Sequence, residues 1–350
     1  MVLNVRHKFA GQQPSLSAMK EHDSHRYRHH RLLYDIDLPL QGNGLENSTG
    51  LYYTQFGIGT PAKTYYVQVD TGSDVLWVNC AGCKNCPTTS SLGVNLQLYD
   101  PKASSTAKNI TCQQEFCNVA YGMNANCASN MACYFQMEYG DGSATGGYYV
   151  SDVIQYNEVI GNSQTSPANT SIAFGCAVVS TGDLATSNGA LDGILGMGPS
   201  STSVVSQLAS SGVVKDTFAH CLAGASGGGI FVIGEVVQPE VQTIPLLQND
   251  QVVSFMFMVH YNVNLESVEV GGTVLQIPAS AFSSSNLETI IDSGTTLAYL
   301  IDTIYQPMMN AILSQHPNLT NQLPCFQYTG RYDISVHYKA CHIVGSLLSI

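Results

Sequence analysis

A motif that occurs twice is the feature of this sequence that most constrains its fold. VDTGSDVLWV (Val69–Val78, the first motif) and IDSGTTLAYL (Ile291–Leu300, the second motif) both read apolar-Asp-(Ser/Thr)-Gly-(Ser/Thr). Their acids, Asp70 and Asp292, lie 222 positions apart in a chain of 350 residues. One Asp-Thr-Gly is a common chance match, but two copies in strand-like surroundings predict two related lobes that contribute one acid each.

The rest of the chain predicts an all-β fold. Leu51–Gly59 and Thr64–Asp70 are strand-like and are separated by the turn-forming pair Thr60-Pro61. Short β-branched and aromatic runs between clusters of Gly, Ser, Asn and Pro continue through Phe231–Gly234 and His260–Val270. This alternation of short strands and turn residues is typical of all-β proteins.

Helical patterning is sparse. The best candidates are Ser203–Ser210 and Asp302–Gln315, the second opened by an Asp that can cap free backbone amides. The longest apolar stretch, Val252–Val259, is far too short to span a bilayer and is predicted to be a buried strand.

Charge is unevenly distributed and argues against nucleic-acid binding. The formal net charge is −12, and no Lys/Arg-rich face is available in the body of the chain to neutralise phosphates. Residues 1–34 hold six of the thirteen basic residues and two acids, whereas residues 35–350 hold seven basic residues and twenty-three acids. The basic arm is either a solvated tail or a prosegment that lies across an acidic cleft and is released by acid.

Taken together, the motifs resemble those of the pepsin-family aspartic peptidases, and closely those of the plant aspartic proteinase-like branch. The resemblance covers about residues 48–328 and is specific because many segments match in combination. These segments are YYTQFGIGTP, VDTGSDVLWVNC, YGDGSATGGYYVSD, IAFGC, ALDGILGMG, FAHCL, GGGIFVIG and IIDSGTTLAYL.

The resemblance implies a bilobal pepsin-like fold and an aspartic endopeptidase that cuts protein or peptide substrates at acid pH. It implies a monomer without metal or cofactor. The expected divisions are a prosegment-like arm at 1–47, an N-terminal catalytic lobe at 48–244 and a C-terminal lobe at 245–350. Because the family continues for about half a lobe beyond Cys325–Gly330, the second lobe is expected to be incomplete.

The chemistry of a pair of aspartates explains why each motif contains an Asp followed by a Gly. Gly72 and Gly294 let backbone approach backbone, so the carboxylates of Asp70 and Asp292 can meet around one water molecule. Two like charges at such a distance cannot both ionise, so the pair shares a proton. One carboxylate then activates the water while the other protonates the peptide carbonyl. The neighbouring hydroxyls are expected to orient the acids by hydrogen bonds, namely those of Thr71, Ser73, Ser293 and Thr295.

Two further sites follow from the resemblance. Tyr139, Gly140 and Asp141 resemble the tip of a flap over the substrate, the alternative being an ordinary hairpin. Trp77, the sole tryptophan, resembles the residue that steadies the flap tyrosine, although a lone aromatic is more often a core residue.

An apolar-apolar-Gly segment threads beside each catalytic loop in this family. Ile194-Leu195-Gly196 provides it for Asp70, and its Gly follows that Asp by 126 positions. The Gly of Ile343-Val344-Gly345 follows Asp292 by only 53 positions, so this second match is predicted to be accidental.

The cysteines predict disulfides and an oxidising compartment. Seven of the eleven fall in one region, at Cys80, Cys83, Cys86, Cys112, Cys117, Cys127 and Cys133. A metal site at Cys80, Cys83 and Cys86 is the alternative. The resemblance implies the nested pairs Cys112–Cys133 and Cys117–Cys127.

The predicted compartment is the secretory pathway or the exterior of the cell. Four Asn-x-Ser/Thr sequons agree with this prediction, at Asn47, Asn109, Asn169 and Asn318. The first residues carry no apolar signal-peptide region, and the last residues lack the pattern of a lipid anchor.

The leading functional hypothesis is an active acid endopeptidase made as a zymogen. A pepsin-like fold retained as a binding or inhibitory protein is the second, although such relatives usually lose one acid. An inactive shortened isoform is the third.

Overall fold

A computed structural model of the chain describes residues 35–44, 50–121, 128, 130–160, 164–223, 227–235, 243–247, 260–282, 289–315, 319–322, 325–328 and 339–345. Most of the basic arm, the predicted strand at Val252–Val259, Cys127 and the sequons at Asn47 and Asn318 lie outside these residues. The division into an arm and two lobes therefore stays a prediction.

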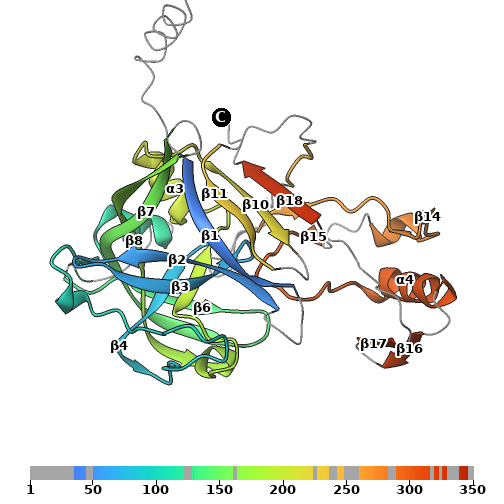
Figure 1. Cartoon of the computed structure of the whole chain (residues 1–350), viewed down its shortest axis with the longest axis horizontal. Helices are drawn as coiled ribbons and strands as arrows, with labels where there is room; N and C mark the ends of the chain where they lie inside the picture. The colour runs from blue at the N-terminus through green and yellow to red at the C-terminus, as the bar shows by residue number, and fades with distance from the viewer. Residues whose placement is uncertain are drawn as a thin grey trace, which may run out of the picture.

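One twelve-stranded sheet dominates the described residues, which confirms the all-β prediction (Figure 1). Along its main path the strands run in the order β18-β10-β11-β1-β2-β3-β9-β4-β8-β7-β5, and β6 pairs with β7. The strands are β1 (Asp35–Asn43), β2 (Leu51–Ile58), β3 (Lys63–Asp70), β4 (Leu76–Lys84), β5 (Lys108–Asn109), β6 (Tyr134–Glu138), β7 (Ala144–Ile160), β8 (Gln164–Thr181), β9 (Gly193–Gly196), β10 (Thr217–Ala223), β11 (Gly229–Ile233) and β18 (Lys339–Gly345).

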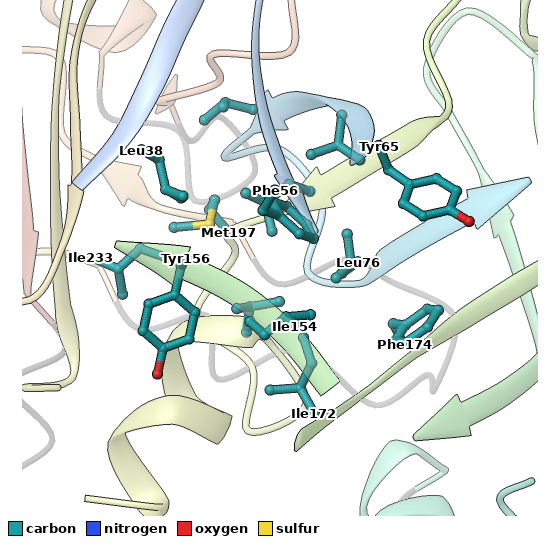
Figure 2. Close-up of a cluster of buried hydrophobic side chains, with 14 of the residues drawn as sticks. Leu38, Phe56, Tyr65, Leu76, Ile154, Tyr156, Ile172, Phe174, Met197 and Ile233 are labelled. Atoms are coloured by element: carbon teal, nitrogen blue, oxygen red, sulfur yellow. The ribbon is translucent and has the colours of Figure 1, made fainter. Parts of the chain in front are cut away.

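Side chains along the strands of this sheet alternate between the buried core and the more exposed face. In β3 the odd-numbered residues Tyr65, Val67 and Val69 are buried, while Tyr66 and Gln68 on the other face remain partly exposed. Figure 2 shows side chains from distant strands meeting in this core, among them Phe56, Ile154, Phe174 and Ile233. Burial of this apolar surface is the main stabilising contribution to the fold.

The first motif ends β3 and enters β4, and β9 lies between these two strands. β9 pairs in parallel with β3, opposite Asp70 at Gly196, and antiparallel with β4. A Cβ on Gly193 would lie 1.9 Å from the carbonyl oxygen of Trp77, so only glycine permits this approach. The prediction that Ile194-Leu195-Gly196 threads beside Asp70 is confirmed.

Both predicted helices are present. α3 (Val204–Ser210) begins after Ser203, whose hydroxyl accepts a hydrogen bond from the backbone N–H of Ser206, and α4 covers Asp302–Gln315. The sequence did not predict α2 (Glu115–Ala120), because a helix of six residues leaves almost no periodic signal. The described residues also form three 3₁₀ turns, η1 (Pro101–Ala103), η2 (Gly182–Ala185) and η3 (Ala279–Ala281).

The later part of the chain forms short two-stranded pairs. These are β12 (Asn262–Val263) with β15 (Thr289–Ile290), β13 (Glu269–Val270) with β14 (Thr273–Val274), and β16 (Leu319–Gln322) with β17 (Cys325–Tyr328). In Figure 1, α4, β14, β16 and β17 lie together to one side of the large sheet.

The strand β18 belongs to the large sheet. It pairs antiparallel with β10, so Ile343-Val344-Gly345 lies along Thr217–Ala219. This pairing agrees with the prediction that its likeness to Ile194-Leu195-Gly196 is accidental. Among the described residues, no helix has the length and apolar character needed to cross a membrane.

Disulfides tie the first part of the chain, but not with the predicted partners. Cys80 on β4 bonds to Cys176 on β8, Cys83 bonds to Cys86, and Cys117 bonds to Cys133. The implied pairs Cys112–Cys133 and Cys117–Cys127 are therefore wrong.

The physical reason is the position of α2. Its Cys117 is fully buried against Cys133, which precedes β6, and their Cα atoms lie 5.9 Å apart. Since Cys80, Cys83 and Cys86 are all disulfide-bonded, they do not supply thiolates to a metal, and the described residues contain no other cluster suited to one.

Candidate active site

The two motif acids are brought together by the fold. Asp70 is buried at the end of β3, and Asp292 is partly exposed just after β15. A Cβ added to Gly72 would lie 2.5 Å from the carboxyl carbon of Asp292. A Cβ added to Gly294 would lie 2.2 Å from Oδ1 of Asp70. Each carboxylate therefore packs against the glycine of the opposite motif, as expected from the sequence.

Each acid is held by two donors of its own motif. Oδ1 of Asp70 accepts from the backbone N–H of Gly72 at 2.8 Å, and Oδ2 accepts from the Ser73 hydroxyl at 2.5 Å. Asp292 is held in the same way, by the N–H of Gly294 at 2.8 Å and the Thr295 hydroxyl at 2.5 Å. The repeated sequence thus produces a repeated geometry.

The hydroxyls of Thr71 and Ser293 have a different role from the one predicted. The Thr71 hydroxyl donates to the carbonyl of Ile291 at 2.9 Å, and the Ser293 hydroxyl donates to the carbonyl of Val69 at 2.8 Å. Each also accepts from the backbone N–H of the other residue, at 2.9 and 3.1 Å. They join the two motifs to each other, and of the four motif hydroxyls only those of Ser73 and Thr295 bond directly to the acids.

The surroundings of Asp70 favour the protonated form of its carboxyl group. Burial raises the pKa of Asp70 well above its ordinary value, and the nearby Asp292 carboxylate raises it further. The hydrogen bonds from Ser73 and Gly72 act in the opposite direction without cancelling this rise.

A hairpin carries Tyr139 next to the first motif. The β6–β7 turn is closed by hydrogen bonds from the N–H of Gly142 to the carbonyl of Tyr139 and from the N–H of Tyr139 to the carbonyl of Ser143. Gly142 has φ of 81°, which glycine adopts without strain. Asp141 accepts from both the N–H and the hydroxyl of Ser143, which rigidifies the turn that contains Gly140.

The indole of Trp77 reaches this hairpin. Its Nε1–H donates to the hydroxyl of Tyr139 at 2.7 Å, while the ring itself is buried in an apolar cluster that includes Phe135 and Ile194. Burial, followed by the charge of Asp70, raises the pKa of Tyr139, so its hydroxyl stays protonated. Trp77 is therefore both a core residue and a partner of the hairpin tyrosine.

Four contacts at the site were not anticipated from the sequence. Gln68 donates its side-chain amide to the carbonyl of Gly294 at 3.1 Å, and the hydroxyl of Thr296 donates to the carbonyl of Gly50 at 2.5 Å. Asp74 is held by a hydrogen bond with Ser200, and burial raises its pKa. No sequence pattern signals these contacts, because each joins segments far apart in the chain.

The fourth contact is made by Asp192, which precedes β9. Its carboxylate accepts from the backbone N–H groups of Tyr66 and Gln97, at 2.8 and 2.6 Å. Burial raises the pKa of Asp192 to about 6, although these two hydrogen bonds lower it. The acid fixes β3 and the loop before Tyr99 against β9.

Family models and sequence relatives both match most of this chain. A model described as xylanase inhibitor N-terminal matches residues 52–235, and one described as xylanase inhibitor C-terminal matches residues 260–340. Aspartic proteinase 36 of Arabidopsis thaliana is 43% identical over 351 residues, which cover 99% of this chain and 70% of the relative. Aspartic proteinase 39 of the same plant is 39% identical, with 95% and 68% covered.

A solved structure agrees with the fold. The crystal structure of edgp superposes with a TM-score of 0.62 at 21% identity, covering 83% of this chain and 74% of that one. The fold and the sequence relatives together define the class as pepsin-like. The chain belongs to the plant family of pepsin-like aspartic proteinases.

Proposed function

We propose that this protein is an aspartic endopeptidase in which Asp70 and Asp292 activate a water molecule at acid pH. The observation that carries the proposal is the mutual packing of each carboxylate against the glycine of the opposite motif. This packing holds two acids at one point, where a single water can contact both.

The reaction follows from one proton shared by the pair. The ionised carboxylate takes a proton from the water as its oxygen attacks the carbonyl carbon of the peptide bond. The protonated carboxyl gives its proton to the carbonyl oxygen. As the tetrahedral intermediate collapses, the acid that took the water proton passes it to the amine nitrogen, which leaves, and one hydroxyl of the intermediate returns its proton to the other carboxylate. The hydroxyls of Ser73 and Thr295 and the N–H groups of Gly72 and Gly294 fix the carboxylates in place for these transfers.

Acid conditions are required because one member of the pair must carry a proton. The raised pKa of Asp70 supports this condition over the mildly acid range. The loss of that proton at higher pH would leave two repelling carboxylates and no general acid.

The Tyr139 hairpin is proposed to close over the bound peptide. Support comes from the position of Tyr139, which accepts a hydrogen bond from Trp77. It also lies close enough to Asp70 for the charge of that acid to raise the pKa of the tyrosine hydroxyl. A closed hairpin would exclude bulk water from the acids and strengthen their electrostatic interactions with the substrate.

Digestion of haemoglobin by the purified chain at pH 3–5 tests the proposal. Turnover that is blocked by a statine-containing inhibitor, which mimics the tetrahedral intermediate, is the expected result. Asp70→Ala should abolish turnover, whereas Asp183→Asn, a change at an exposed acid on η2, should not. Inhibitor binding without turnover would favour the alternative of a binding or inhibitory protein on the same fold.

The secretory pathway is the proposed compartment. It is supported by the disulfides Cys80–Cys176 and Cys117–Cys133, which persist in oxidising surroundings. Asn109 on β5 and Asn169 on β8 are exposed sequon residues and can carry N-linked glycans. A mass decrease at both peptides after treatment with a peptide-N-glycosidase would support this proposal, and unmodified peptides together with free thiols in the protein isolated from whole cells would count against it.

A further inference from the structure

The side chain of Gln68 connects the two motifs at a point that the motif pattern does not include. Gln68 lies on β3, two residues before Asp70, and is held in the sheet between Tyr53 on β2 and Ile194 on β9. Its Nε2 donates a hydrogen bond of 3.1 Å to the carbonyl oxygen of Gly294, which is 226 residues away. The bond is partly buried, so water competes with it less than at an exposed site.

Gly294 is the residue through which this bond acts on the acids. The N–H of Gly294 donates to Oδ1 of Asp292, and its Cα approaches Asp70 so closely that a Cβ would lie 2.2 Å from Oδ1 of that acid. The amide of Gln68 therefore fixes a glycine that contacts both carboxylates. A displacement of Gly294 would change the distance between the two acids and would also loosen the N–H donor of Asp292.

The corresponding position in the second motif cannot make the same contact. The residue two positions before Asp292 is Ile290, whose side chain has no polar group to donate to the carbonyl of Gly72. The Thr71–Ser293 exchange is symmetric, so it cannot alone specify how the second motif sits against the end of β3. Gln68 adds a one-sided contact to this symmetric pair.

We propose that Gln68 is a positioning residue that sets the separation of Asp70 and Asp292 through the carbonyl of Gly294. This inference rests on the proposed function for its effect on turnover. Gln68 bonds to the backbone of the second motif and not to a carboxylate, so it acts by holding that motif in place. A hydrogen-bond donor at this position is the chemical requirement, because the acceptor is a backbone carbonyl that no substitution at position 294 can remove.

Gln68→Met tests the requirement for a donor, because methionine keeps the length of the side chain and loses the amide. We expect kcat for a peptide substrate at pH 4 to fall about ten-fold with little change in KM, since only the geometry of the acids is altered. The affinity for a statine-containing inhibitor should fall by a similar factor. Gln155→Met, at an exposed position on β7, is the matched control and should leave both values unchanged.

Gln68→Glu provides a second readout that a purely structural role would not move. A glutamic acid has an ordinary pKa near 4.3, so at about pH 3 it is protonated and can donate to the carbonyl of Gly294. Above that pKa it becomes a carboxylate that cannot donate and that repels the acid pair. Activity of this variant should approach the wild-type value at pH 3 and fall off at a lower pH than in the wild type.

The outcomes separate this inference from the proposed function. Wild-type turnover with unchanged kcat and inhibitor affinity in Gln68→Met would overturn the role of Gln68 and leave the proposed function standing. A wild-type chain that binds the inhibitor without turnover would contradict the proposed function. In that case inhibitor affinity still decides the inference, because a ten-fold loss in Gln68→Met supports it and no loss contradicts it.

Discussion

Thr71 and Ser293 exchange hydrogen bonds across the two motifs, each hydroxyl accepting from the backbone N–H of the other residue. Each hydroxyl also donates to a carbonyl of the opposite motif. The result is a closed set of four hydrogen bonds beneath the two carboxylates. Because residues 71 and 293 immediately follow the acids, the spacing of Asp70 and Asp292 depends on this set.

Removal of one hydroxyl from this exchange should destabilise the site. Ser293→Ala leaves the N–H of Thr71 and the carbonyl of Val69 without their partners, at a cost of about 1–3 kcal/mol in the free energy of unfolding. Ser293→Thr keeps the hydroxyl and should restore most of the loss. Chemical denaturation of the two variants measures the difference, and equal stability of the alanine and wild-type chains would contradict the role of the exchange.

Stability should fall between pH 4 and pH 7 because of buried acids. The pKa of Asp192 is about 6 in the folded chain, above its ordinary value near 3.9 when unfolded. A raised pKa means that the folded state holds the proton more tightly than the unfolded state. The stabilisation that this proton gives to the folded chain is therefore complete below about pH 4. It is lost as the pH rises to about 6, and Asp70 and Asp74 act with the same sign.

Thermal unfolding at a series of pH values measures this effect. Asp192→Asn should lower Tm at pH 4, since its amide cannot accept from both N–H groups, and should flatten the decline toward pH 7. Asp183→Asn, at an exposed acid, should leave the wild-type slope unchanged. An identical slope in Asp192→Asn and wild type would exclude Asp192 as the source.

Loss of the hydroxyl of Tyr139 should impair turnover. Tyr139→Phe removes the acceptor of the Trp77 Nε1–H while keeping the ring, so we expect kcat/KM to fall about ten-fold. Tyr134→Phe is a matched control in the same hairpin, because the Tyr134 side chain is exposed. If the two variants were equally active, the hairpin contact would have no role in catalysis.

The disulfide pairing can be decided by peptide mapping of the non-reduced chain. We expect a linked peptide that contains Cys117 and Cys133, and another that contains Cys80 and Cys176. Conversion of Cys117 and Cys133 to Ser should cost about 3 kcal/mol, as for a closed loop of this length. A peptide that links Cys112 to Cys133 would contradict the structure and restore the pairing implied by the family resemblance.

The sequence predicted the parts of this fold that leave a local signal. The strands around Thr60-Pro61, the helices α3 and α4, and the approach of Asp70 to Asp292 all follow from patterns within ten or so residues or from the repeat itself. The partner of Cys117 could not be read in the same way, because it depends on where the short helix α2 packs.

The supporting residues of the site were equally hard to predict. Gln68 lies on the partly exposed face of β3, where a glutamine is usually solvated. The group that accepts its hydrogen bond is a backbone carbonyl in the other half of the chain. Thr71 and Ser293 follow the acids directly, but their bonds to backbone groups of the opposite motif become evident only once the two motifs are brought face to face.

Rates of peptide hydrolysis at pH 4 for Asp70→Asn, Asp292→Asn and the double variant test the central claim most directly. Residues that act as one unit are non-additive, so each single variant should lose at least about a thousand-fold in kcat and the double variant little more. Circular dichroism confirms that each variant is folded. A single variant that retains near-wild-type turnover, or independent losses that multiply in the double variant, would contradict a shared catalytic pair.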